Sequence, residues 1–225
     1  MTSTTVEALE GRIRGVIADK AMVSHPFLSA WTGGTLEREG LREFARQYWH
    51  FEAAFPRFLS GIHCRTESAR IRQLLLENLW DEEHGERNHP RLWLDFAGHL
   101  GLSARDVVDS AMNDETAALV RHFERVTREG PVAEALATLF AFEGQVPNLS
   151  WLTIRSLVEH YEMRPDQFEF FSTHLVADLA HSDAEIAAIH ESCTDEEAVV
   201  TATEVACDRL LRFLDGCEQA AGSTS

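Results

Sequence analysis

Three side chains that can ionise or bind a metal recur at helical spacing late in the chain, namely His174, Asp178 and His181. At about 100° per residue they fall within an arc of roughly 60° on one helix face. Apolar residues, among them Phe171 and Leu175, flank that same face. Burying ionisable groups without partners costs roughly several kcal/mol each. The segment therefore predicts either a site for a first-row divalent metal or a set of core histidines satisfied by hydrogen bonds.

Two other predicted helices carry similar side chains on the face that should be buried. In the segment 67–87, Glu77 and His84 are seven residues apart and share a face within about 20°. Asp81 lies between them and could itself be the ligand or a partner of one. Glu143 follows several apolar residues at helical spacing, so we expect it on an apolar face, paired with a cation or bound to metal.

Other polar residues near these segments receive different expectations. Glu82 points mostly away from the face of Glu77, so we expect it to be solvated, and we expect His89 to be a structural or surface residue. Glu52 lies at the edge of an apolar stripe, where a glutamate is either half-exposed or functional. Tyr48 lies on the core side of the same predicted helix.

The inward-pointing ligand types together comprise three carboxylates and three imidazoles from three helices. One metal ion seldom needs six protein ligands and an open position as well. Two irons that share a bridging carboxylate would use such a set and leave positions for oxygen, whereas zinc is satisfied by four ligands. The predicted metal ligands are Glu77, His84, Glu143, His174, Asp178 and His181.

The elements that must position these residues are helical almost throughout. Apolar residues recur every three or four positions, no segment alternates over the length of a strand, and turn signals separate long segments. No repeat, linker or shift in composition divides the chain. We therefore expect residues 1–225 to form a single all-α domain, with a frayed tail from about residue 220.

The composition argues against several classes of partner. The chain has 20 basic and 37 acidic residues and a formal net charge of -17, so nucleic acid and anionic lipid would be repelled. No apolar run approaches the ~20 residues of a membrane span. The first residues do not resemble a signal peptide, and the four cysteines show no CxxC pairing. These features favour a cytoplasmic protein with free thiols and without nucleic-acid or membrane partners.

The ordered set of ligand types resembles that of the haem-oxygenase-like di-iron oxidases, a branch of the TenA/PqqC-like group. The likeness spans nearly the whole chain. Its specific part is Glu-x6-His at Glu77 and His84, the lone helical Glu143, and the His-x3-Asp-x2-His motif of residues 174–181. This order matches the subgroup around the chlamydial death-domain-associated protein. The resemblance implies a haem-oxygenase-like (TenA-like) bundle of about seven helices, and it suggests a homodimer.

The same resemblance implies an activity and a cofactor. It indicates an O2-dependent non-haem di-iron oxidoreductase in which two ferrous ions react with O2 to give a peroxo-di-iron(III) species. Glu143 would bridge the irons, and Glu52 and Tyr48 are the expected catalytic residues. An additional carboxylate such as Glu52 is a feature of nitrogen-oxygenating members. We therefore favour N-oxygenation of a small amine or amino acid in specialised-metabolite or cofactor biosynthesis, with an external electron donor.

Three alternatives remain. The same cofactor could cleave a C–C bond or decarboxylate an amino or fatty acid. An aminobenzoate-forming oxidase of the folate pathway is a second alternative. Its known members are thought to consume an internal tyrosine and to need a lysine, and Phe27 and Thr153 stand where we look for those residues. The third alternative is a non-catalytic helical protein that binds iron or a partner helix.

Overall fold

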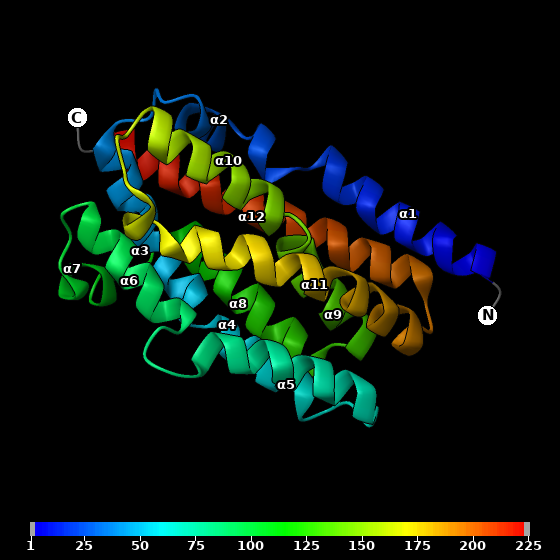
Figure 1. Cartoon of the computed structure of the whole chain (residues 1–225). Helices are drawn as coiled ribbons and strands as arrows, with labels where there is room; N and C mark the ends of the chain where they lie inside the picture. The colour runs from blue at the N-terminus through cyan, green and yellow to red at the C-terminus, as the bar shows by residue number, and fades with distance from the viewer. Residues whose placement is uncertain (1–2, 223–225) are drawn as a thin grey trace.

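The computed structural model describes the backbone of residues 3–222, and the side chains within it except those of 3–7 and 176–183. Over these residues the chain forms α-helices and two short 3-10 helices (Figure 1), which confirms the predicted all-α class. The α-helices of the described part are α1 (Ser3–Asp19), α2 (Pro26–Thr32), α3 (Arg38–Glu52), α4 (Phe55–His63), α5 (Ala69–Glu83), α6 (His89–His99), α7 (Ala104–Val108), α8 (Asp114–Glu129), α9 (Val132–Glu143), α10 (Val146–Glu159), α11 (Glu169–Ser192) and α12 (Glu196–Gly222), with η1 at Met22–Ser24 and η2 at Pro165–Gln167.

The expectation of about seven helices is too low, because turns interrupt segments whose apolar spacing reads as continuous. The predicted helix that contains Tyr48 and Glu52 is divided into α3 and α4. Pro56 stands in the first turn of α4, where its missing N–H is not needed. A proline inside a continuous helix would instead remove a backbone hydrogen bond, so the break precedes it.

A second break follows α5 and matters for the site. α5 ends at Glu83, and Gly85 adopts a φ of 83°, a left-handed conformation that favours glycine. The side chain of Asn88 then caps α6 by accepting a hydrogen bond from the backbone N–H of Arg91, at 3.1 Å. The turn therefore makes His89 the first residue of a new helix.

α9 occupies the centre of the bundle. It packs against α8, α11 and α12, and α11 crosses in front of it (Figure 1). Every residue from 135 to 143 is buried, as expected for a helix that is apolar nearly all round. Glu143 is the one charged residue in that run, so the sequence delivers a carboxylate to the middle of the core.

Buried apolar side chains from α1 through α12 form one cluster. From the sequence we expect a single domain over residues 1–225. That expectation stays a prediction. Among the described residues, no helix is both long enough and apolar enough to cross a lipid bilayer. The four cysteines are free thiols.

Candidate metal centre

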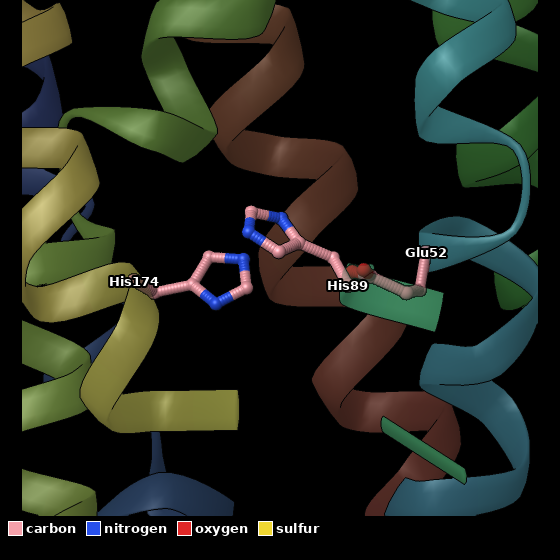
Figure 2. Close-up of side chains that lie close together, drawn as sticks. All are labelled: Glu52, His89 and His174. Carbon is pink, nitrogen blue, oxygen red and sulfur yellow. The ribbon is translucent and has the colours of Figure 1, made fainter. Parts of the chain in front are cut away.

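Three buried side chains from three helices meet inside the bundle: Glu52, the last residue of α3, His89, the first of α6, and His174 of α11 (Figure 2). One possible ligand atom of each lies within 4.8 Å of those of the other two. Their exposed fractions are 3%, 4% and 6%. A single metal ion could therefore contact all three side chains away from solvent.

His174 is held in the form that binds a metal. Its Nδ1 lies 2.8 Å from the backbone carbonyl oxygen of Phe170 and donates to it, because a carbonyl can only accept. The lone pair of the other nitrogen, Nε2, is thus left for a ligand. Burial, and then the proximity of His89, lower the pKa of His174 to about 3, so the ring is neutral at physiological pH. The two imidazole rings are 4.2 Å apart between centroids.

Three buried glutamates, Glu52, Glu82 and Glu143, lie near these histidines. Burial, and then the charge of Glu82, raise the pKa of Glu52 to about 8, although His89 and a hydrogen bond from the Tyr48 side chain act in the opposite direction. Burial and the charge of Glu143 raise the pKa of Glu82 well above its usual range. Three glutamates buried so close together must either keep protons or have a positive charge beside them.

Hydrogen bonds satisfy only part of this cluster. Asn78 of α5 donates from Nδ2 to Oε1 of Glu143 at 2.8 Å. Within the described part of the chain, Oε1 of Glu52, Oε2 of Glu82 and Oε2 of Glu143 have no hydrogen-bond partner. Such atoms are rare in folded proteins and call for an unseen partner.

Glu82 and His89 approach each other closely without forming a hydrogen bond. Oε1 of Glu82 lies 3.0 Å from Nδ1 of His89, yet that nitrogen has no hydrogen-bond partner among the described residues. Burial lowers the pKa of His89, so the imidazole is not a ready counter-ion for the carboxylate. Two ligands of one cation would approach in this way. The donor set of carboxylates and neutral imidazoles fits iron.

The structure places the predicted ligands unevenly. Glu143 and His174 are buried, as expected. The expectation that Glu77 and His84 point inward is wrong, because both side chains are exposed. His84 lies beyond the end of α5 and stacks on the exposed ring of Trp80, with centroids 3.7 Å apart. Glu77 accepts a hydrogen bond from Gln73 at the surface.

The other alternative on α5, Asp81, is also exposed. Asp178 and His181 lie outside the residues whose side chains the structure describes, so their role as ligands stays a prediction. The expectations for Glu52 and Tyr48 placed them near this interior, and both side chains are buried there.

Glu82 and His89 were not predicted as ligands, because Glu82 was expected to be solvated and His89 to be a structural or surface residue. They repeat the Glu-x6-His spacing five residues further along the chain. A signal was present, because the buried face of α5 runs through Ile71, Leu75, Asn78 and Glu82, at intervals of three and four residues. Extending this buried face to the end of α5 identifies Glu82, and not Glu77, as the inward-pointing glutamate.

Two hollows adjoin the cluster, and they have no lining residue in common. An open cleft of about 590 Å³ reaches His89 from the surface and is lined also by Trp80, Arg87 and Ser172. A smaller interior cavity of about 60 Å³ is lined by His174, Tyr48 and a shell of mostly aromatic side chains. The cluster therefore adjoins both an open cleft, at His89, and a pocket lined mainly by aromatic side chains, at His174.

Comparison with known proteins bears on this site. Residues 42–211 match a family described as iron-containing redox enzyme. A 4-aminobenzoate synthase of Nitrosomonas europaea is 40% identical over 221 residues, which cover 92% of this chain and 90% of that protein. A 4-aminobenzoate synthase of Chlamydia trachomatis serovar D is 33% identical, covering 89% and 87%. The crystal structure of a TenA homologue from Pseudomonas syringae pv. tomato superposes with a TM-score of 0.79 at 18% identity, covering 95% and 92%.

Proposed function

The chain belongs to the family of iron-containing redox enzymes, and on this premise we propose that it is an O2-dependent oxidase that forms 4-aminobenzoate or a closely related aromatic amine. The assignment of iron is supported mainly by one observation, the buried group of Glu52, His89 and His174. The product is suggested by relatives whose printed name is 4-aminobenzoate synthase. This similarity moves aminobenzoate formation ahead of the N-oxygenation favoured by the sequence motifs.

The residues proposed to hold iron extend beyond the trio. Glu82 and Glu143 bring two further carboxylates to the same interior, and we propose that they complete a site for two ions. Asp178 and His181 are retained as proposed ligands from the family pattern. Iron, when bound, supplies the one-electron chemistry that allows O2 to oxidise an organic substrate.

The protein contributes orientation and exclusion of water. The carbonyl of Phe170 fixes the tautomer of His174, and Asn78 holds the Glu143 carboxylate. Tyr48 donates a hydrogen bond to Glu52 and lines the interior cavity, so we propose that it positions this carboxylate between cofactor and pocket. Burial keeps the imidazoles neutral and therefore able to bind metal.

N-oxygenation of a small amine is the second candidate, and a specific observation favours it. Lysine-dependent aminobenzoate formation would need a lysine at the site, and Lys20 is the only lysine of the chain. It forms ion pairs with Asp208 and Glu204, on the face shared by α1 and α12. Thr153 lines the interior cavity instead. A chain of this composition would have to obtain its nitrogen from a separate small molecule.

One experiment separates these candidates. The chain is expressed in a bacterium that cannot make 4-aminobenzoate, and growth without this compound is measured beside the His89→Ala variant. We expect the wild type to restore growth and the variant to fail. If growth is not restored while the purified iron-loaded protein consumes O2 with an amine and yields a product heavier by one oxygen, the second candidate replaces the first. Absence of O2 uptake and of growth contradicts both.

A further inference from the structure

The interior cavity shares a wall with the candidate metal centre. His174 belongs to the metal-binding group and Tyr48 donates a hydrogen bond to Glu52, and both side chains line the cavity. The remaining walls come from helices that approach from other directions, such as α6 with Trp93 and α9 with Phe142. Whatever occupies this space is therefore placed against the side chains proposed to hold iron.

The size of the cavity limits its occupant. Its volume is about 60 Å³. An engineered apolar cavity of about 150 Å³ holds one benzene or xenon, whereas one water needs about 10–15 Å³. The space beside His174 is thus too small for an aromatic ring in this state of the protein. It is large enough for a diatomic molecule or a single xenon atom.

The chemistry of the walls disfavours water. Aromatic rings dominate the lining, and it contains no Asp, Glu, Lys or Arg. Two polar groups of the lining are engaged, because His174 Nδ1 donates to the Phe170 carbonyl and Tyr48 to Glu52, and Nε2 of His174 is the proposed metal-binding atom. Further polar groups of the lining are the hydroxyls of Ser150 and Thr153 and the indole Nε1 of Trp31, which has no hydrogen-bond partner among the described residues. A buried water needs two to four polar partners, so water could be held beside these groups but not throughout the space.

We propose that this cavity, which has no lining residue in common with the open cleft, is an apolar binding site for dioxygen beside the metal centre. The inference rests on the proposed use of O2 by the enzyme. It adds that O2 and polar molecules reach the metal centre through different spaces. The small apolar oxidant occupies the cavity beside His174, while polar molecules reach His89 through the cleft that Arg87 and Ser172 line.

A matched pair of substitutions on α10 tests the site. Leu149 lines the cavity and is half-buried, so Leu149→Phe can fill the space without disrupting the core. Ile154 is half-buried on the same helix and does not line the cavity, so Ile154→Phe makes a comparable change elsewhere. Circular dichroism and thermal unfolding of both variants establish that they fold.

The first readout does not depend on activity. Crystals of the full chain are pressurised with xenon, and the anomalous signal is measured. We expect one xenon atom beside His174 in the wild type and in Ile154→Phe, and loss of that atom in Leu149→Phe. Ordered water filling the cavity, or an equal xenon signal in all three proteins, would overturn the inference.

The second readout is the dependence of O2 consumption on O2 concentration in the iron-loaded enzyme. Because a lost binding site raises KM more than it lowers kcat, we expect KM for O2 to rise about threefold or more in Leu149→Phe and to stay unchanged in Ile154→Phe. O2 uptake with an unchanged KM in Leu149→Phe contradicts the dioxygen site alone. If the wild type binds xenon but takes up no O2, the proposed function is contradicted, and with it the assignment of the cavity to O2. The two failures are therefore distinguishable.

Discussion

The Glu52 carboxylate is 3% exposed, and burial and the charge of Glu82 raise its pKa to about 8 in the metal-free protein. The ordinary value of 4.5 applies in the unfolded chain. Between these two values the unfolded chain has lost a proton that the folded protein keeps. Because the folded state binds more protons there, this residue makes the folded state less stable as the pH rises through that window.

Glu52→Gln should therefore stabilise the metal-free protein at alkaline pH. We expect the free energy of unfolding to increase by about 1–3 kcal/mol at pH 8 and by much less near pH 5, since glutamine has no proton to lose. Chemical denaturation of both proteins at the two pH values measures the effect. An equal difference at both values would show that the charge of Glu52 is not the cause. The same variant should bind iron more weakly.

The register of the Glu-x6-His pair can be tested residue by residue. His89 is buried in the cluster, whereas His84 stacks on Trp80 at the surface. We expect His89→Ala to lower iron affinity by at least about tenfold, because it removes a direct ligand, and His84→Ala to leave it unchanged. Iron content after dialysis against a chelator is the measurement. Loss of iron from His84→Ala but not from His89→Ala would restore the register inferred from sequence.

At the scale of elements, the helices that carry Glu143 and His174 could be predicted because apolar residues recur along both at helical spacing. The buried face of α5 was harder to predict, because leucines and acidic residues lie on several sides of this helix. The apparent helix through 67–87 also hides a turn at Gly85. That turn brings His89 back toward the core from the start of α6, although residues seven apart on one straight helix would be about 10 Å apart along its axis.

The hydrogen bond between α5 and α9 gives a prediction for Asn78, which contacts a proposed metal ligand but is not itself one. Asn78→Ala removes the donor to Oε1 of Glu143. We expect iron affinity to fall by about tenfold, and the free energy of unfolding by about 1–3 kcal/mol, because the buried carboxylate loses its partner. Competition with a coloured chelator and urea denaturation measure the two effects. Gln73→Ala, which removes a surface hydrogen bond to Glu77, is the control and should change neither.

For the whole molecule, the all-α class and the interior location of Glu143 and His174 followed from helical spacing. The number of helices did not, because breaks such as that before α4 leave the apolar spacing nearly intact. The gathering of Glu52 with His89 and His174 also depends on how three helices pack. Spacing within one helix carries no information on such tertiary contacts.

Iron should stabilise the whole fold, since it would bind only where these helices meet. At a free concentration of 100 times Kd, a ligand adds about 2.7 kcal/mol, which corresponds to a rise in Tm of about 5–10 °C for a chain of this size. Calorimetry of metal-free and anaerobically loaded protein measures the shift, and chelation should reverse it. An unchanged Tm at saturating iron would argue against a buried centre.

Anomalous diffraction at the iron edge, from crystals of the iron-loaded protein, tests the buried metal centre most directly. We expect an anomalous peak within bonding distance, about 2.0–2.2 Å, of nitrogen or oxygen atoms of His89, His174 and Glu52. A peak at the surface beside Glu77 and His84, or no peak within the bundle, would contradict it.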